Sequence, residues 1–375
     1  MRITEIRNSL PSRIVIGAGS SEKIAEELRD SITLIITDRG VLAAGLTDKL
    51  TRHIQKFDLF ADISAEPTTD DLDKALAVVN KGNYDAIVGI GGGSVLDVAK
   101  AVTALDKSVL SAREALAGKD IRDPATLKRQ TPPYFVAMPT TAGTGSESTL
   151  NAIFIDSGDG VKKAIISEAC LPRAAVLDPE LTVSLPAGLT ASTGTDALCH
   201  CVESLISVNA NPISETYSIR GIGLIEQNLT EAVKSPQNIE ARRNMLTASF
   251  LGGAALAIAG TTAVHALAYP LGKRGVPHGI ANSMLFIPVM SFNLDACRKK
   301  LASLATVEKN AEQVMRRFEE MLASLPLPST VSDFSISISE LDILAEEALK
   351  QTRLLNNNPK PLSLEDIKNI YAQIL

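Results

Sequence analysis

The sequence predicts two domains of different class, an α/β domain over residues 1–182 and an all-helical domain over residues 183–375. Length is the first observation, because 375 residues exceed what one hydrophobic core usually serves and suit two packed domains. The second is that short β-branched runs alternate with helical stretches in the first half. The third is that only long Ala-, Leu- and Ile-rich segments follow from about Pro186 onward.

Each expected strand of the first half is a short run rich in apolar and β-branched residues. We place these strands at Arg13–Ile16, Thr33–Thr37, Ala86–Ile90, Phe135–Met138 and Ala175–Leu177. Helices are expected between them at Ser20–Leu28, Thr69–Val79 and Ser94–Ala104. Strands that alternate with helices form a mostly parallel sheet with both faces covered. The polar segment Lys107–Pro133 is expected to be a surface excursion between two strands.

The second half is expected to be helical throughout. Its clearest helices are Ala197–Ser207, Glu215–Lys234, Glu240–Ala268 and the periodic stretch Leu364–Leu375. Pro270 is expected to close the third of them. The link Asp178–Gly188, which contains Pro and Gly, is the natural border between the two domains.

Composition excludes several classes of protein. The 37 basic and 43 acidic side chains give a net charge of −6, without the basic patch that nucleic acids and anionic membranes require. Aromatic residues make up 4% with no Trp, which disfavours a stacking-based binding module. No apolar run reaches the ~20 residues of a membrane helix, and the start MRITEIRNSLPSR lacks the apolar core of a signal peptide. Four cysteines form no disulfide framework in so long a chain, so we expect a cytoplasmic protein.

A glycine-rich turn, Gly91-Gly92-Gly93-Ser94, joins an expected strand to an expected helix that carries Asp97 and Lys100. Such a turn directs free backbone N–H groups and the positive end of the helix dipole at one point, which favours a phosphate group. A tight turn that simply needs glycine is the alternative. The motif is neither a Rossmann fingerprint, because Ser94 stands where the last Gly belongs, nor a P-loop. We favour phosphate binding.

Two further features are compatible with a nucleotide. The loop Pro139–Glu147 follows a strand and carries small hydroxyl residues, Thr140, Thr141 and Thr144, that can contact a second face of the same ligand. Asp38 follows another strand, where a carboxylate can accept from both hydroxyls of an adenosine ribose and would repel a 2′-phosphate. A helix N-cap is an equally good interpretation of Asp38 alone.

The four histidines are the most informative residues of the second half, because three of them fall in the expected helical domain. Asp196 and His200 are four residues apart and therefore project from one face of a helix. With His265 and His278 they offer one carboxylate and three imidazoles, which suit Fe²⁺ or Zn²⁺. A single histidine of this kind is more often a hydrogen-bonded core residue, and we assign His53 to the surface.

Cys199 and Cys201 flank His200 but are not expected to join it as ligands. Neighbours in a helix point about 100° apart, so both are interpreted as packing residues. Cys170 and Cys297 have no partner at a ligand-like spacing.

In this order, the motifs closely resemble the iron-containing (group III) alcohol dehydrogenase family over essentially the whole chain. The resemblance rests on Pro11…Gly17-Ala18-Gly19, Gly91–Lys100, Pro139–Thr144, Asp196…His200…His265…His278-Gly279 and Arg353–Pro359. It implies the fold of that family and of dehydroquinate synthase: an α/β nucleotide-binding domain followed by an all-helical metal-binding domain, with the active site in the cleft. It also implies a homodimer.

By this resemblance the residues of the site take specific roles. The metal ligands would be Asp196, His200, His265 and His278, with His265 also counted as catalytic. The cofactor-binding residues would be Asp38, Gly92, Gly93, Ser94, Asp97, Thr140, Thr141, Thr144, Asn151 and Lys163. A plain surface role is the alternative for Asn151 and Lys163.

Two departures from the family pattern are visible. Tyr269 stands where many members carry a second histidine assigned to proton relay, and it is the second catalytic candidate beside His265 because its hydroxyl can still donate and accept a proton. An unperturbed tyrosine pKa of about 10 makes it a poorer acceptor at neutral pH. Lys273-Arg274 stands where relatives tend to be apolar or aromatic. We hypothesise that this pair lies at the substrate mouth and favours an aldehyde with an anionic tail; a solvated loop is the alternative.

The expected activity is hydride transfer between a primary alcohol and a nicotinamide cofactor, with the metal polarising the substrate oxygen. Asp38 favours NAD over NADP, and iron is preferred with zinc as the alternative. A zinc polyol dehydrogenase of the glycerol type, a dehydroquinate synthase-like lyase and a non-catalytic nucleotide-binding module are the rivals. The intact set of one Asp and three His disfavours the polyol dehydrogenase and the non-catalytic module. The lyase should carry several basic residues beside the metal motif for a phosphate-binding pocket, and only Lys273-Arg274 qualify.

Overall fold

A computed structural model of the chain describes residues 6, 8–105, 111–117, 132–305 and 310–375. The structure divides into two compact units, one of Ser9–Thr141 and Gly145–Ser184, the other of Met1–Asn8, Ala142–Thr144 and Leu185–Leu375. The first is the α/β unit and the second is the helical unit. Among the described residues that the sequence predicts for the first domain, 6, 8 and 142–144 are grouped with the helical unit.

The α/β unit is built on a six-stranded parallel sheet with the strand order β1-β8-β5-β4-β2-β3. The strands are β1 (Arg13–Ile16), β2 (Ile32–Ile36), β3 (Lys56–Phe60), β4 (Ala86–Gly91), β5 (Tyr134–Pro139) and β8 (Ala174–Leu177). The five predicted strands are confirmed. Sequence analysis missed β3 because it is an edge strand, exposed along most of its length, in which Lys56 and Asp58 interrupt the apolar pattern.

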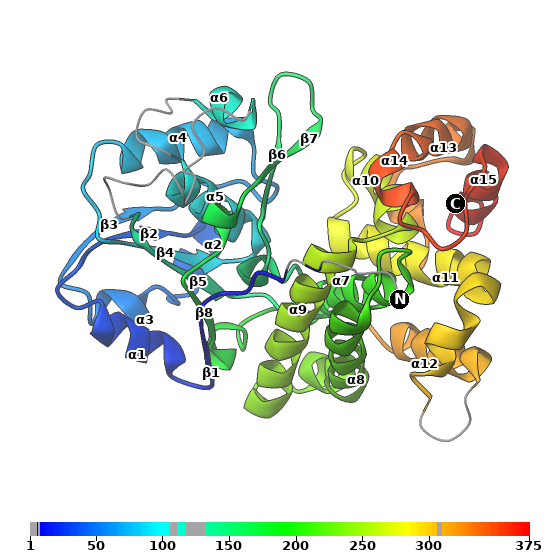
Figure 1. Cartoon of the computed structure of the whole chain (residues 1–375), viewed down its shortest axis with the longest axis horizontal. Helices are drawn as coiled ribbons and strands as arrows, with labels where there is room; N and C mark the ends of the chain where they lie inside the picture. The colour runs from blue at the N-terminus through cyan, green and yellow to red at the C-terminus, as the bar shows by residue number, and fades with distance from the viewer. Residues whose placement is uncertain (1–5, 7, 106–110, 118–131, 306–309) are drawn as a thin grey trace. The chain divides into compact units, whose positions relative to one another are not determined.

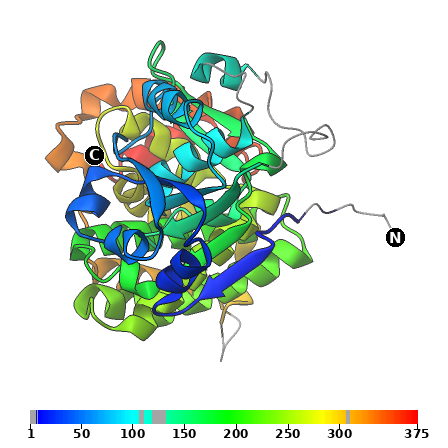
Figure 2. The same ribbon diagram turned by 90° about the vertical axis from the view of Figure 1, so that its left-hand side faces the viewer.

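Helices cover both faces of this sheet (Figure 1). On one face α4 (Thr69–Val79), α5 (Gly93–Ala104) and α6 (Ala112–Leu116) contribute to one apolar cluster. On the other face α1 (Ser20–Glu27), α2 (Arg39–Ala43) and α3 (Asp48–Thr51) contribute to a second. Figure 2 shows the same unit turned toward the viewer, with β1 in blue at the border of the sheet. This is the doubly covered parallel sheet that the alternating pattern predicts.

A separate antiparallel hairpin, β6 (Asn151–Ile155) and β7 (Lys162–Ile166), was not expected from the sequence. Its signal was the alternation in β6, where buried Ala152 and Phe154 stand between half-buried neighbours. Of the predicted excursion at Lys107–Pro133, residues 107–110 and 118–131 lie outside the described part of the chain, and the described part contains α6.

The helical unit contains α7 (Ala187–Ile206), α8 (Pro212–Lys234), α9 (Ile239–Ala259), α10 (Ala263–Gly272), α11 (His278–Ala302), α12 (Ala311–Ala323), α13 (Leu341–Leu349), α14 (Thr352–Leu355) and α15 (Leu364–Tyr371). Only 3₁₀ turns accompany them in the described residues, so the prediction of a helical second half is confirmed. Helix α11 is long and apolar enough to cross a membrane by length and composition. Half of its apolar window is buried within the chain, and it packs against α7, α10 and α12, as a core helix does.

The predicted single helix Glu240–Ala268 is wrong, because the chain bends by 104° between α9 and α10. Gly260 ends α9 with a φ of 73°, a backbone conformation that side chains disfavour. Pro270 does not close α10 but lies inside its last turn, and the helix ends at Gly272. The bend is important for the site because it sets the direction in which α10 starts.

Candidate metal centre and cofactor-binding loops

The four residues predicted as metal ligands come from three helices of the helical unit. Asp196 and His200 lie one turn apart on α7, His265 lies in the first turn of α10 and His278 is the first residue of α11. The start of α11 lies close to α7, since a Cβ on Gly279 would stand 2.5 Å from the Ser192 carbonyl oxygen. The glycine after His278 is therefore required for these helices to meet.

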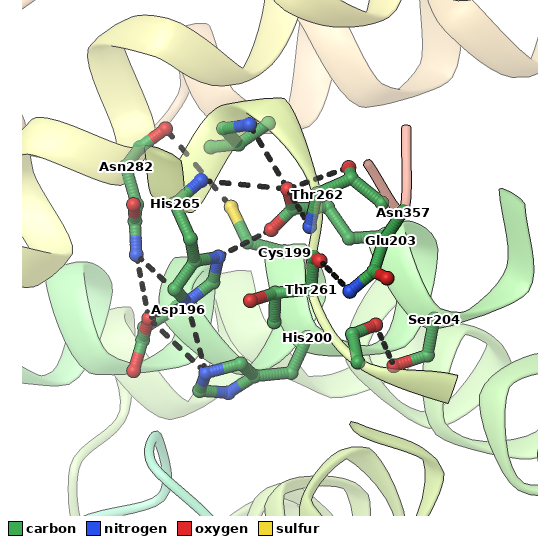
Figure 3. Close-up of polar contacts among 12 residues, drawn as sticks. Asp196, Cys199, His200, Glu203, Ser204, Thr261, Thr262, His265, Asn282 and Asn357 are labelled. Atoms are coloured by element: carbon green, nitrogen blue, oxygen red, sulfur yellow. Dashed lines mark hydrogen bonds and ion pairs between the residues drawn. The ribbon is translucent and has the colours of Figure 1, made fainter. Parts of the chain in front are cut away.

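These side chains converge on one carboxylate oxygen. The Oδ1 atom of Asp196 lies 3.8 Å from Nε2 of His200, 3.6 Å from that of His265 and 3.7 Å from that of His278. The Nε2 atoms of His200 and His265 are 3.0 Å apart. The first three of these groups are buried, with exposed fractions of 3% for Asp196, 6% for His200 and 4% for His265. Figure 3 shows Asp196, His200 and His265 pointing toward one another.

The chemistry of this donor set fits a divalent cation. Four groups that carry lone pairs face one another, so a proton or a metal ion must separate them. Burial raises the pKa of Asp196, but His200 and the other two imidazoles outweigh it and hold that pKa far below its usual range. Burial lowers the pKa of His200, whereas Glu203 and Asp196 outweigh burial at His265 and raise its pKa to about 9. A bound cation would displace that proton.

Two side chains that sequence analysis missed contact this cluster. Asn282 lies one turn after His278 on α11 and donates through Nδ2 to Asp196 Oδ1 at 2.8 Å, while its own Oδ1 is buried without a hydrogen-bond partner among the described residues. Glu203 lies three residues after His200 and accepts a hydrogen bond from His265 Nδ1. A glutamate inside the apolar run Ala197–Ile206 was the available signal for Glu203, because a buried carboxylate needs partners.

The other ring nitrogen of His200 is also held. His200 Nδ1 lies 3.2 Å from the backbone oxygen of Gly143, in the short segment that the structure groups with the helical unit. A Cβ on Gly143 would stand 2.8 Å from the Thr193 side chain, so glycine permits this close approach to α7. Thr144 follows directly in the same segment, and its assignment to the cofactor stays a prediction.

The glycine turn joins β4 to α5 as the sequence predicts. Gly91 ends the strand, Gly92 is an extended N-cap and the helix starts at Gly93. A Cβ on Gly91 would stand 2.5 Å from Val95, so the turn requires glycine there. The N–H groups of the first turn have no acceptor within the helix, which leaves them available to an anion. The Ser94 hydroxyl donates to the Ala65 carbonyl at 2.6 Å.

Asp97 is hydrogen-bonded within the α/β unit, and its assignment to the cofactor stays a prediction. Its carboxylate accepts from the Ser146 hydroxyl at 2.6 Å and from the Ile153 backbone N–H at 3.0 Å. One turn later, fully buried Lys100 donates to the Thr149 hydroxyl and to the Asn151 carbonyl oxygen. Together they hold the loop after β5 and the start of β6 against α5.

Three further residues predicted to bind the cofactor, Asp38, Thr140 and Thr141, also lie in the α/β unit. Asp38 caps α2 by accepting from the Val41 N–H at 2.9 Å, so the capping interpretation is correct for one carboxylate oxygen. The second oxygen accepts no hydrogen bond from the described residues. Thr140 is buried, and Thr141 lies close to the glycine turn, since its Oγ1 would be 3.6 Å from a Cβ on Gly92.

Lys163 and Asn151 lie on the hairpin. The ammonium group of Lys163 on β7 pairs with Asp156 and, at 2.9 Å, with Asp159, and these two carboxylates raise its pKa. Asn151 begins β6, where its backbone oxygen accepts from Lys100. Lys163 is thus engaged within the hairpin turn.

Three residues that depart from the family pattern lie on or just after α10. The ring of Tyr269 is 6.3 Å from that of His278, centroid to centroid, which places Tyr269 next to the metal cluster. Arg274 is not a free cation: it donates to Glu340 and to Glu347 at 2.8 Å each. The Lys273 ammonium is 3.7 Å from Glu347. The positive charge of this pair is therefore balanced within the helical unit, which argues against an anion-selecting role.

All four cysteines are free and buried, which agrees with the interpretation of Cys199 and Cys201 as packing residues. Burial raises the pKa of the Cys201 thiol to about 12, so Cys201 stays a neutral thiol. Its sulfur would lie 2.5 Å from a Cβ on Gly221 of α8.

Comparison with known proteins identifies the same family for both halves of the chain. Residues 11–179 match the iron-containing alcohol dehydrogenase model, and residues 190–375 match the C-terminal model of the Fe-containing alcohol dehydrogenase family. Among curated proteins, long-chain-alcohol dehydrogenase 1 of Geobacillus thermodenitrificans is 34% identical over 95% of this chain and 93% of its own.

Solved structures agree with this result. A 1,3-propanediol oxidoreductase superposes with a TM-score of 0.88 at 29% identity, over 99% of this chain and 100% of its own. Sulfoacetaldehyde reductase from Bifidobacterium kashiwanohense, solved in complex with NAD⁺, superposes with a TM-score of 0.87 at 26% identity, over 99% of each chain.

Proposed function

We propose that this chain, which belongs to the iron-containing alcohol dehydrogenase family, interconverts a primary alcohol and its aldehyde with NAD(H) as the hydride carrier. The family establishes a metal-dependent alcohol dehydrogenase or aldehyde reductase. The observation that carries the finer proposal is the convergence of three imidazoles on one buried aspartate within 3.6 to 3.8 Å.

Asp196, His200, His265 and His278 would hold the metal ion, for which the family supports iron; zinc accepts the same donors. When bound, the ion supplies Lewis acidity that polarises the substrate oxygen, and the nicotinamide supplies or accepts the hydride. The chain keeps the donors in place. Gly143 fixes the ring of His200 through Nδ1, and Asn282 donates to the Asp196 carboxylate. Burial of these groups excludes water and strengthens their electrostatic interactions.

Tyr269 is the residue next to this cluster that can handle a proton, through its phenolic Oη. The Tyr269 ring lies beside His278. His278 is the most exposed of the three imidazoles, with 32% of the His278 side chain accessible. Tyr269→Phe would remove the hydroxyl and retain the ring. We expect a lower kcat with unchanged metal content; an unchanged kcat and pH profile would remove Tyr269 from the mechanism.

For the cofactor, the free N–H groups at the start of α5 would bind the pyrophosphate, and the second oxygen of Asp38 would accept from the adenosine ribose. The NAD⁺ found in the sulfoacetaldehyde reductase supports this choice of cofactor. Asp38→Ala should raise the KM for NADH and relax the discrimination against NADPH, with some loss of stability from the missing cap. An efficiency with NADPH equal to that with NADH in the unmodified protein would refute the assignment.

A homodimer in the cytoplasm completes the proposal. It is supported by the family and by the four unpaired cysteines, which suit a reducing compartment. The substrate is proposed only as a small alcohol or aldehyde.

The deciding experiment measures NADH and NADPH oxidation against neutral and anionic aldehydes, after separate reconstitution of the metal-free protein with Fe²⁺ and Zn²⁺. His265→Ala should lose bound metal and activity together. His53→Ala is the matched control, because His53 lies in the α/β unit, remote in sequence from the donor set, and its Nδ1 is 3.9 Å from the Glu26 carboxylate. Absence of both metal binding and aldehyde-dependent NADH oxidation in the pure protein would refute the proposal.

A further inference from the structure

Glu203 is a fully buried carboxylate in the interior of α7. Burying a carboxylate costs free energy unless hydrogen bonds compensate its charge. In this protein both oxygens of Glu203 are used, and each serves a different part of α10. Figure 3 shows Glu203 between His265 and Thr262.

The Oε1 atom fixes the start of α10. It accepts from the Thr262 N–H at 2.9 Å, the Thr262 hydroxyl at 2.8 Å and the Val264 N–H at 2.9 Å. Thr262 is the N-cap of α10 but provides no side-chain cap of its own. Glu203 therefore caps this helix from α7, with its negative charge at the positive end of the helix dipole. This fixes the backbone that carries His265.

The Oε2 atom of Glu203 accepts a hydrogen bond from Nδ1 of the His265 ring. A carboxylate has no proton to donate, so the proton of this hydrogen bond is on Nδ1. In the neutral imidazole the lone pair is then on Nε2, the atom that lies 3.6 Å from Asp196 Oδ1. One side chain thus determines both the place of His265 and the nitrogen that it presents.

We infer that Glu203 is a positioning residue for the metal centre, which selects the Nε2-ligating tautomer of His265 and thereby sets the affinity for the metal. The inference rests on the metal site of the proposed function. Partners of this kind that orient metal-ligating histidines typically contribute 10- to 100-fold in metal affinity.

The chain offers a control that separates this role from general support of the α9–α10 turn. Asn357 holds the same turn from the other side, donating to the Thr261 carbonyl at 3.0 Å, and its amide would lie 2.5 Å from a Cβ on Gly260. It makes no hydrogen bond to the His265 ring. Asn357→Ala therefore loosens the turn and leaves the contact between Glu203 and His265 in place.

The experiment compares unmodified protein, Glu203→Gln and Asn357→Ala. The Zn²⁺ dissociation constant is measured by competition with a chelator, with Zn²⁺ as the only added ligand. We expect Glu203→Gln to weaken binding by about 10- to 100-fold. The glutamine cannot satisfy both the ring and the three donors at Thr262 and Val264 without pointing its own N–H₂ at one of them. Asn357→Ala should lower the unfolding temperature with less than about a threefold change in the dissociation constant.

A spectroscopic signature accompanies the affinity. With only four histidines in the chain, ¹⁵N-histidine labelling of the Zn²⁺-loaded protein gives a readable spectrum. The Nδ1–H proton of His265 should resonate far downfield because a carboxylate accepts it. It should move upfield in Glu203→Gln and stay in place in Asn357→Ala.

Equal Zn²⁺ affinity of Glu203→Gln and the unmodified protein would overturn the inference, and so would an equal loss in Asn357→Ala. If Glu203→Gln does not fold, Glu203→Asp is used, because it keeps the charge but is one methylene too short to reach both partners. An affinity of Glu203→Asp equal to that of the unmodified protein would also overturn the inference. Failure of the unmodified protein to bind Zn²⁺ would instead refute the metal site of the proposed function.

Discussion

Glu147 is a buried acid for which the fold provides too few partners. Its exposed fraction is 1%, and its Oε1 atom has no hydrogen-bond partner among the described residues. Burial raises its pKa from 4.5 to about 7, although Lys100 acts in the opposite direction. The carboxyl group is therefore protonated in the folded protein at a pH where it would be ionised in the unfolded chain.

The magnitude follows from linkage. For a raised carboxyl pKa, stability is highest below the unfolded value near 4.5 and falls as the pH rises toward the folded value near 7. A shift of this size corresponds to about 3 kcal/mol once both states are ionised, and most of it falls between pH 5 and pH 8. The Glu147→Gln variant does not titrate at this position. The free energy of unfolding of the variant minus that of the unmodified protein should therefore rise by about 2–3 kcal/mol over this range.

The assay is urea unfolding of both proteins at half-unit pH steps, followed by a probe in the α/β unit that contains Glu147. A buried glutamine also has too few hydrogen-bond partners, which changes the free energy of unfolding of the variant by the same amount at every pH. The test of the prediction is therefore how the difference between the two proteins changes with pH. The other titrating groups are common to both proteins and cancel. Parallel pH profiles from pH 5 to pH 8 would show that Glu147 is not a strained buried acid.

Three further predictions concern the helical unit. Gly221→Ala should destabilise the helical unit by about 1–3 kcal/mol, because the added Cβ would lie 2.5 Å from the Cys201 sulfur. Gly223→Ala in the same helix meets nothing within 4 Å and should stabilise the unit by about 0.5–1 kcal/mol. Urea unfolding of both variants checks the pair, and equal effects would contradict the packing argument. Arg274→Leu should cost about 1 kcal/mol of stability from its partly exposed ion pairs and change the KM of anionic and neutral aldehydes equally; a selective rise for the anionic substrate would restore a role in specificity. Removing the metal should lower the thermal unfolding midpoint of the helical unit, and adding metal back at 100 times its dissociation constant should restore about 2.7 kcal/mol, which calorimetry measures.

The fold class of each half could be predicted from the sequence alone because local residue patterns encode it. Alternating strands and helices predicted the covered parallel sheet, and five of its six strands follow from apolar runs. Where local signals were weak the prediction failed. The exposed edge strand β3 contains charged residues, so its sequence does not show the apolar pattern of a strand. The apolar run continues through Gly260, so the sequence does not show that α9 ends there, which depends on one backbone conformation. The hairpin β6–β7 is short enough for its alternation to be overlooked.

For the candidate site, the pairing of Asp196 with His200 was predictable because four residues make about one helical turn. The hydrogen bonds of Asp97 were not predictable, since only the fold brings its carboxylate to the Ser146 hydroxyl and the Ile153 N–H. The balanced charge of Arg274 likewise depends on Glu340 and Glu347, which are more than 60 residues away in the sequence.

By itself, therefore, the sequence determined the class of each half and the glycine turn and suggested the candidate donor residues, because these depend on residue type and short spacing. Only the tertiary structure decided which of those residues meet. Asp196, His265 and His278 come from three helices, and the 104° bend after α9 aims the start of α10 at α7. The physical reason is that a buried charged group needs hydrogen-bond partners or counter-charges, and these come from residues that are distant in the sequence and adjacent only in the folded chain. Glu203, which looked like one acid in an apolar helix, is satisfied only by the turn and the ring that the fold brings to it.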